Sequence, residues 1–405
     1  MRGTRKGPIG WPLTAGVESP LSFLLRDVNP VEFFARHWGR VPLYVRGGDR
    51  NFDGLLKEPW RQARARSQQI RAVKLASDGR QAKISVSLKD LERRAPRNGV
   101  TICSDHRDPG LAAFMEKLRV ELGLTGRTFF AQCYESSNKS GLKGHFDSAH
   151  VLVLQMEGEK RWLVSKSPLI NYPAADAVVT EGRTIQGRRL RPPRKSECLD
   201  VILRSGDFLY VPPGAWHQPI ARGHSMSLSL SPASMSMGQL LTAMLERDLD
   251  PEWQWRQLLS PLYDPQMRGR FPAARAQARR FIAQFRAFAN DIDEREVLGA
   301  WLSAIPAPSV DERAMKRTRW IKTTRLRHVS PGALRVLVQG TEVSLHHGGI
   351  VATVSSDALP LVRWLAAHAT FTLGEAAEAM RPAYELREVK KLTRILLEAG
   401  VLELM

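Results

Sequence analysis

Two stretches of sequence decide the fold of this chain. The first is Gly144-His145-Phe146-Asp147, and the second is Gly206-Asp-Phe-Leu-Tyr-Val-Pro-Pro-Gly-Ala-Trp-His217. Alternate residues of a β-strand point to the same face, so His145 and Asp147 reach one metal ion from a single strand. Two imidazoles and one carboxylate hold Fe(II) on one face and leave the other face open for oxygen chemistry. The sequence therefore predicts a metal site of His145, Asp147 and His217, with His217 on a strand that folds back beside the first.

The residues that precede His217 favour this arrangement. Residues 207–211 are rich in aromatic and β-branched side chains, which favour a strand. Pro212, Pro213 and Gly214 follow and predict a stiff turn, because proline fixes φ and glycine accepts conformations that other residues avoid. Nitrogen and oxygen ligands do not by themselves select iron, so a zinc or nickel enzyme with isomerase or hydrolytic activity is the main competing chemistry.

The two stretches resemble the paired metal motifs of the cupin superfamily. The spacing Gly206-x5-Pro212-x-Gly214-x2-His217 is similar to the second cupin motif, and His145-x-Asp147 to the jumonji-type form of the first. Residues 151–162 and 30–43 are also similar to this family. From roughly residue 20 onward, the chain resembles the bacterial jumonji-type (JmjC) ribosomal oxygenases, such as the 50S ribosomal protein arginine hydroxylases, which hydroxylate a side chain of a ribosomal protein.

The resemblance implies Fe(II) as the metal and 2-oxoglutarate as the co-substrate. It places the cation that binds the distal carboxylate of 2-oxoglutarate at Lys160, 15 residues after His145. A lysine there is a point charge that holds one carboxylate without the forked geometry of arginine. Arg161 is expected to point to the opposite face of a regular strand.

Other candidate residues flank the metal motifs. Gln132 and Tyr134 alternate on the strand before the metal loop, and Ser227 lies on the strand after His217, so all three are candidates for the co-substrate pocket. The family often has asparagine at the positions of Gln132 and Ser227. Asn138 and Ser140, in the loop that enters the first motif, are candidate substrate contacts. His150, His224 and Trp216 are predicted to have structural roles.

Composition bounds the class of protein. The chain has 405 residues, of which 43% are apolar, and a net charge of +19 that suggests an anionic partner such as nucleic acid. No apolar run reaches the roughly 20 residues that span a bilayer, and the basic N-terminus lacks the apolar segment of a secretion signal. Cys103, Cys133 and Cys198 form neither a zinc pattern nor a disulfide framework. We expect a cytoplasmic protein that does not enter membranes.

The pattern of elements predicts an α+β protein in three parts. Residues 1–235 form a catalytic double-stranded β-helix of the cupin (JmjC) type with an N-terminal helical cap, because short strands with Gly/Pro turns argue for a barrel. Strands are expected at 128–134, 145–156, 160–164, 199–203, 208–211 and 225–230. Between them, residues 171–198 are long, polar and basic, and a long insertion near a pocket mouth is more often functional or mobile than structural.

The other two parts have helical character. Residues 236–305 are predicted to be helical, with a long helix at 266–288, and the resemblance implies a dimerisation region and a homodimer. Residues 306–405 combine short strands with three helices and resemble a winged-helix domain. The face of its last helix carries Arg387, Lys390, Lys391 and Arg394, which makes nucleic-acid contact a secondary expectation, since exposed helix faces are routinely this basic.

The favoured hypothesis is an Fe(II)- and 2-oxoglutarate-dependent dioxygenase that hydroxylates a protein side chain, with a ribosomal protein as the substrate that the resemblance suggests. A second hypothesis keeps this chemistry but takes a peptide natural product or a methylated lysine as substrate. A third is a basic winged-helix nucleic-acid-binding protein whose cupin domain is not catalytic. Metal-independent nucleic-acid affinity with a steep salt dependence distinguishes the third hypothesis from the others.

Overall fold

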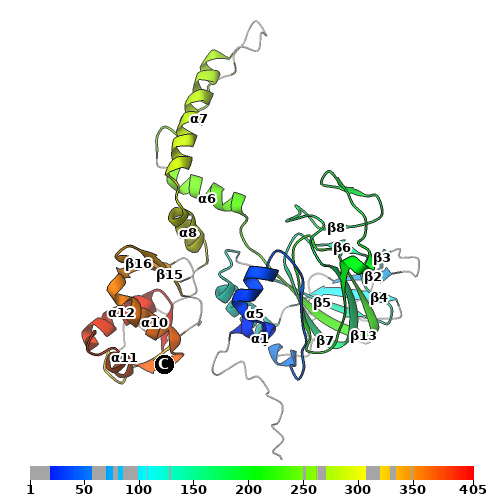
Figure 1. The fold of residues 1–405 in the computed structure, drawn as a ribbon, viewed down its shortest axis with the longest axis horizontal. Helices are drawn as coiled ribbons and strands as arrows, with labels where there is room; N and C mark the ends of the chain where they lie inside the picture. The colour runs from blue at the N-terminus through cyan, green and yellow to red at the C-terminus, as the bar shows by residue number, and fades with distance from the viewer. Residues whose placement is uncertain are drawn as a thin grey trace, which may run out of the picture. The chain divides into compact units, whose positions relative to one another are not determined.

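The structure of residues 1–405 is a computed structural model (Figure 1). It describes residues 19–56, 70–75, 81–84, 99–106, 108–126, 129–249, 252–260, 262, 271–306, 320–328, 334–347 and 350–405. The chain divides into two compact units, of which the first runs to Ala233 and takes in two short later segments, and the second begins at Ser234.

The first unit is built on an 11-stranded antiparallel sheet in the order β1-β12-β7-β13-β5-β4-β2-β3, with β11 beside β7 and β6 between β13 and β8. The strands curl around a common interior (Figure 1). Their bounds are β1 Leu43–Val45, β2 Ile70–Leu75, β3 Gln81–Ile84, β4 Val100–Asp105, β5 Phe129–Ser136, β6 His145–Phe146, β7 Val151–Ser165, β8 Ala177–Val178, β11 Cys198–Leu203, β12 Phe208–Val211 and β13 His217–Pro232. A separate hairpin pairs β9 (Thr184–Ile185) with β10 (Arg188–Arg189).

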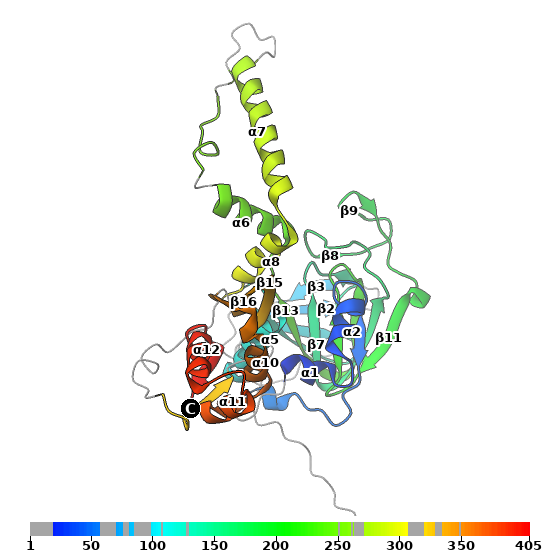
Figure 2. The ribbon, with the colours of Figure 1, turned by 60° about the vertical axis from the view of Figure 1, so that its left-hand side comes forward.

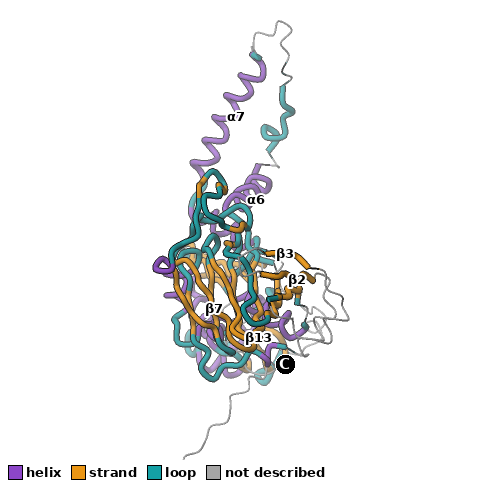
Figure 3. Tube along the Cα trace, turned by 90° about the vertical axis from the view of Figure 1, so that its right-hand side faces the viewer, coloured by secondary structure: helices purple, strands orange, loops and turns teal. Residues whose placement is uncertain are grey.

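The two long strands β7 and β13 lie side by side and form the centre of the sheet (Figure 3). Both bend where their register shifts, and Gly158 makes this possible: its φ is +67°, and a Cβ there would lie 2.0 Å from the carbonyl oxygen of His224. The bend changes which residues of β7 face inward. Before the bend, the even-numbered Leu152 packs in the core that also contains the helices, and the odd-numbered Val153 packs in a second apolar cluster. After the bend, the even-numbered Trp162 belongs to that second cluster.

Helices cover the outer face of the sheet. Helix α5 (Pro109–Leu122) begins at Asp108, whose carboxylate accepts hydrogen bonds from two backbone N–H groups, and ends at the left-handed Gly123. Its Leu111, Phe114 and Leu118 recur at helical spacing and pack with α1 (Pro20–Leu25) against the sheet. This apolar layer fixes the sheet from outside, so polar side chains on the inner face remain available for a site.

At the N-terminus, the Asn29 side chain caps α2 (Pro30–Glu32), which continues into a π-helical turn at Phe33–His37. Three of the strands expected from the sequence have other bounds in the structure. The strand expected at 145–156 is two strands, β6 and β7, and β7 runs on through the strand expected at 160–164. Likewise β13 begins at His217 rather than at 225, because pairing with β7 continues across the bulge.

From Ser234 onward, the described residues form the helices α6 to α8, followed by short strands and the helices α10 to α12. A short 3-10 turn at Ser356–Ala358 precedes α10. The bounds are α6 Met237–Leu249, α7 Pro272–Asp291, α8 Glu294–Ser303, β14 Arg325–His328, β15 Arg335–Gln339, β16 Glu342–His347, β17 Ile350–Ser355, α10 Leu359–Ala367, β18 Thr370–Thr372, α11 Leu373–Ala379, α12 Leu386–Glu398 and β19 Leu402–Leu404. The strands form two small sheets in the orders β18-β14-β19 and β15-β16-β17. Part of the helix expected at 266–288 lies outside the described residues.

Among the residues that the structure describes, none of the helices is both long enough and apolar enough to cross a membrane.

Candidate metal centre

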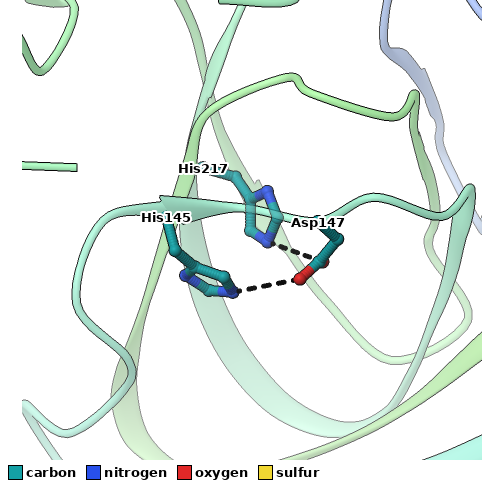
Figure 4. A group of neighbouring side chains, drawn as sticks. All are labelled: His145, Asp147 and His217. Carbon is teal, nitrogen blue, oxygen red and sulfur yellow. Dashed lines mark ion pairs between the residues drawn. The ribbon is translucent and has the colours of Figure 1, made fainter. Parts of the chain in front are cut away.

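The three predicted metal ligands meet at one point (Figure 4). Their ligand atoms all lie within 4.8 Å of one another, although His217 is 70 positions from Asp147 in the sequence. One carboxylate oxygen of Asp147 lies 3.7 Å from His145 Nε2, and the other lies 3.4 Å from His217 Nε2. The antiparallel register places His217 directly opposite His145, which brings the two imidazoles together.

Both histidines present the correct nitrogen to the centre. Nδ1 of His145 lies 2.7 Å from the carbonyl oxygen of Lys143, and Nδ1 of His217 lies 3.0 Å from that of Ala215. A carbonyl oxygen only accepts hydrogen bonds, so each Nδ1 carries the proton and each Nε2 keeps a lone pair for a metal. Protein groups thus hold the imidazoles in their metal-binding tautomer.

The electrostatics of this cluster suit a cation. His217 is 3% exposed, and burial followed by the neighbouring His145 lowers its pKa well below the usual value. Burial raises the pKa of Asp147, with Asp176 adding to the increase and His145 opposing it. The unprotonated His217 imidazole and a carboxylate whose charge is poorly solvated both gain from a bound divalent cation. The donor set therefore fits an Fe(II)-type ion.

The turn of the second motif locks the two metal loops together. Gly214 donates its N–H to the carbonyl oxygen of Asp147 at 2.8 Å. The φ of Gly214 is +76°, and a Cβ would lie 1.7 Å from the carbonyl oxygen of Ile170, so only glycine fits. Gly144 packs directly on the Trp216 ring, where a Cβ would lie 2.2 Å from the nearest ring atom. These contacts explain the small residues beside the ligands.

A cavity of about 260 Å³ opens beside the metal ligands, and Lys160 lies in its wall. Lys160 is 2% exposed and donates to the Ser227 hydroxyl at 3.0 Å and to the Tyr134 carbonyl oxygen at 3.4 Å. No carboxylate among the described residues forms an ion pair with it. Burial lowers its pKa to about 8. A buried ammonium with neutral partners alone is a position that an anionic ligand stabilises.

The other predicted co-substrate residues lie in the same cavity. Gln132, Tyr134 and Ser227 all line it, and the Tyr134 hydroxyl donates to Gln132 Oε1 at 2.6 Å. Burial raises the pKa of Tyr134, which keeps the hydroxyl protonated. Arg161 faces away as predicted and pairs with Asp200 at 2.6 Å. The structure thus brings together the four residues that the sequence assigned to 2-oxoglutarate.

The two predicted substrate contacts do not line this cavity. Asn138 is exposed and accepts a hydrogen bond from the N–H of Gly223 at 3.0 Å. Ser140 is fully buried, with its hydroxyl 2.7 Å from the carbonyl oxygen of Ser137. The Asn138 side chain instead holds the loop that leads to the first metal motif against β13, and the Ser140 hydroxyl bonds within that loop and to the Val100 carbonyl oxygen of β4. The loop position suggested the pocket mouth, but the chain turns these side chains into local contacts.

The predicted structural residues do have structural contacts. Nδ1 of His150 lies 2.8 Å from the Tyr210 hydroxyl, and burial lowers the pKa of His150 to about 4. His224 Nε2 lies 2.8 Å from a carboxylate oxygen of Glu135. The buried Trp216 belongs to an apolar cluster next to the metal loops.

Several cavity residues were not identified from the sequence. Trp162 is one, with its ring stacked on the His217 imidazole at a centroid distance of 5.6 Å. Asp176, from the long insertion, is another. Four others follow the alternation already used for Gln132 and Ser227, which continues to further inward positions of β5 and β13 and would have found them. They are Phe130, Ser136, Ser229 and Ser231.

Fold and site together define a cupin-type metalloprotein with a two-histidine, one-carboxylate centre. Residues 114–240 match the JmjC domain family. This part of the chain, about a third of its length, is therefore similar to a JmjC domain.

Comparisons with known proteins agree with this assignment. The chain is 25% identical over 268 residues to protein YxbC of Bacillus subtilis, covering 61% of this chain and 80% of YxbC. It is 36% identical over 98 residues to the bifunctional lysine-specific demethylase and histidyl-hydroxylase NO66 of Drosophila melanogaster, covering 23% of this chain and 14% of that protein. Ribosomal oxygenase 1 of Rattus norvegicus is 26% identical over 240 residues, covering 55% of this chain and 38% of that protein. The chain thus spans well under half of the latter two.

A solved structure has the same fold. The ribosomal oxygenase YcfD from Escherichia coli, in complex with cobalt and 2-oxoglutarate, superposes with a TM-score of 0.51 at 18% identity, covering 93% of this chain and 98% of YcfD. This likeness confirms the predicted β-rich α+β fold of the cupin type.

The metal centre makes a direct prediction. Asp147→Ala removes the only carboxylate of the set, so we expect the affinity for Fe(II) or Mn(II) to fall by more than the roughly 10- to 100-fold that an outer partner of a metal ligand contributes. Anaerobic titration calorimetry measures this. His224→Ala is the control, because that imidazole pairs with Glu135 and should leave metal affinity unchanged. Equal affinity of Asp147→Ala and the unmodified protein would show that the three residues hold no metal.

Proposed function

We propose that this protein is an Fe(II)- and 2-oxoglutarate-dependent oxygenase that hydroxylates a protein side chain, with a ribosomal protein as its substrate. The observation that carries the proposal is the shared cavity of the metal ligands and Lys160, a buried cation that pairs with no carboxylate in the described part of the chain. A metal ion and an anionic co-substrate are the two groups that this cavity needs.

Different residues of the cavity bind the metal and the co-substrate. His145, Asp147 and His217 hold Fe(II), and Lys160 with Ser227 binds the distal carboxylate of 2-oxoglutarate. When bound, the metal and the co-substrate supply the activation of O2 that inserts one oxygen atom into a C–H bond. Trp162 restrains the His217 ring by stacking, and the hydrogen bond from Tyr134 orients Gln132 in the cavity.

The ribosomal substrate is supported by the relatives. Ribosomal oxygenase 1 and YcfD are named for action on the ribosome, and NO66 as both a demethylase and a hydroxylase. Hydroxylation and demethylation begin with the same chemistry and differ in what the substrate side chain then releases. A product mass therefore separates them, and it also separates a ribosomal substrate from a peptide natural product.

Incubation of ribosomal proteins with enzyme, Fe(II) and 2-oxoglutarate tests the proposal. We expect one ribosomal protein to gain about 16 Da, the mass of one oxygen atom inserted with 2-oxoglutarate as the co-substrate, and to stay unmodified with His217→Ala, which loses a metal ligand. Intact-mass spectrometry measures the shift. A loss of about 14 Da instead would indicate demethylation, and an unchanged set of masses with active enzyme would remove the ribosomal substrate.

The pKa of Lys160 predicts a pH dependence for co-substrate binding. The free lysine has a pKa of about 8, so it is protonated below that pH and must regain a proton above it before binding a dicarboxylate. The apparent Kd for 2-oxoglutarate should be flat below pH 8 and rise by up to about tenfold per pH unit above it.

Lys160→Met should weaken binding and abolish this pH dependence. Arg161→Met is the matched control: it removes a cation from the next residue, which faces Asp200 on the outside, and should leave both properties unchanged. Titration of the metal-loaded protein with 2-oxoglutarate measures them. A Lys160→Met protein with normal affinity would contradict the anchor role.

Three further features extend the proposal to the whole protein. The strands and helices from β14 to β19 support a winged-helix domain. Three free, buried cysteines support a cytoplasmic setting. The helical region supports a homodimer, because α7 has no buried residue and exposes Phe281, Ile282 and Phe285. Together with residues 253–262 it lines an apolar cavity of about 760 Å³, and such a helix is marginal without a packing partner.

The dimer has its own test. Phe281→Asp places a charge in this apolar face, so we expect a dimer to become a monomer, as measured by sedimentation at micromolar concentration. Val338→Asp is the control, since Val338 is similarly exposed on β15, away from α7 in the sequence. A monomeric unmodified protein would contradict the proposal.

A further inference from the structure

The long insertion between β7 and β11 is a fixed arm rather than a loose loop. We call residues 166–197 the arm. Its two ends are joined, because Ser165 pairs with Cys198 across the ladder and the N–H of Lys166 donates to the carbonyl oxygen of Glu197 at 2.9 Å. The arm therefore leaves the sheet and returns to it at a single place.

The first half of the arm reaches the metal cavity, where Asp176 is part of the lining. Its strand β8 pairs with β6, with Val178 opposite the metal ligand His145. Asp176 accepts hydrogen bonds from the backbone N–H and the hydroxyl of Ser148, both at 2.7 Å. Ser148 directly follows the ligand Asp147. The position of the arm is thus coupled to the metal centre by backbone and side-chain contacts.

The second half of the arm is a folded hairpin. Strands β9 and β10 are joined by Gln186 and Gly187, whose φ values of 49° and 75° are those of a tight two-residue turn. Ile185 and Leu190 pack against the apolar cluster that contains Trp216. Figure 2 shows β9 farther from the central strands than β8. A folded hairpin of this kind presents its surface side chains from a defined place.

That surface is strongly basic. Residues 180–197 contain six basic and two acidic residues, and all six basic ones are exposed. Arg191 pairs with Glu197 at 2.9 Å, and Lys195 reaches Asp200 at 3.4 Å. Arg188 and Arg189, on β10, have no ion-pair partner within the described part of the chain. The arm thus carries guanidinium groups without an ion-pair partner among the described residues, on the same insertion that contributes Asp176 to the cavity.

We propose that the arm docks RNA, so that the protein binds its substrate as part of a ribonucleoprotein. The proposal rests on the proposed function, because it places RNA next to the side chain that is hydroxylated. Guanidinium groups form bidentate hydrogen bonds with phosphate oxygens. A hairpin with several arginines therefore matches the repeated phosphates of a nucleic-acid strand. RNA is favoured over an acidic protein because arginine, rather than lysine, makes up five of the six basic residues.

The basic face of α12 is the rival surface and differs in character. Its Arg394 lies over the Trp320 ring at 5.5 Å, and Glu388 and Glu398 are interspersed with its basic residues. Part of its charge is therefore engaged or compensated within its own unit. This makes α12 a suitable control for the arm.

Binding of a labelled RNA hairpin to the full-length protein tests the proposal. We expect Arg188→Ala/Arg189→Ala to weaken binding by about tenfold at near-physiological salt and to lower the salt slope by roughly 1.5, since each lost phosphate contact contributes about 0.7 to 0.9. Arg387→Ala/Lys391→Ala removes the same charge from α12 and should change the affinity by less than about twofold. Fluorescence anisotropy at several salt concentrations measures both.

Three outcomes would overturn the proposal. The first is an arm variant whose affinity for RNA equals that of the unmodified protein. The second is a loss of binding in the α12 variant alone. The third is displacement of the labelled RNA by polyglutamate of equal charge to the same extent as by unlabelled RNA. Turnover of 2-oxoglutarate without substrate is measured in parallel. It should be normal in the arm variant, so a failure of RNA docking and a failure of the oxygenase assignment give different results.

Discussion

The antiparallel pairing of β13 with both β6 and β7 is the constraint on which the rest of the structure depends. It sets His217 opposite His145, and further along the same strand it sets Ser227 beside Lys160. One ladder therefore positions both the metal ligands and the co-substrate anchor. A slip of one residue would turn these side chains to the opposite face of the sheet, so the register is also the condition for the chemistry.

The site is costly for the fold, and the surroundings limit that cost. A buried lysine, a buried neutral histidine and a poorly solvated carboxylate all oppose folding in the absence of ligands. The apolar layer between the sheet and the helices α1 and α5 offsets this on the outer face. Binding of a cation and a dicarboxylate would stabilise the protein further, since both neutralise charges that the chain leaves unpaired.

Much of the site followed from local patterns, but its walls did not. The cluster of His145, Asp147 and His217 was predictable from local sequence. The alternation of side chains along a strand and the proline-glycine turn can both be recognised from consecutive residues. The continuity of β7 was missed because Gly158 looks like a turn, whereas in the structure it accommodates a bulge against His224. Asp176 had no local signal, because its place depends on the pairing of β8 with β6.

By itself, the sequence determined which residues are the candidates for the chemistry, the basic character of the insertion and the succession of a β-rich part by a helical one. Only the tertiary structure decided that Asn138 and Ser140 turn to local contacts, that Trp162 stacks on His217, and that the insertion pairs with β6 beside His145 and continues into a folded hairpin. The reason is physical: motifs and charge are properties of neighbouring residues, whereas walls and arms arise from strand pairing between residues far apart in the chain.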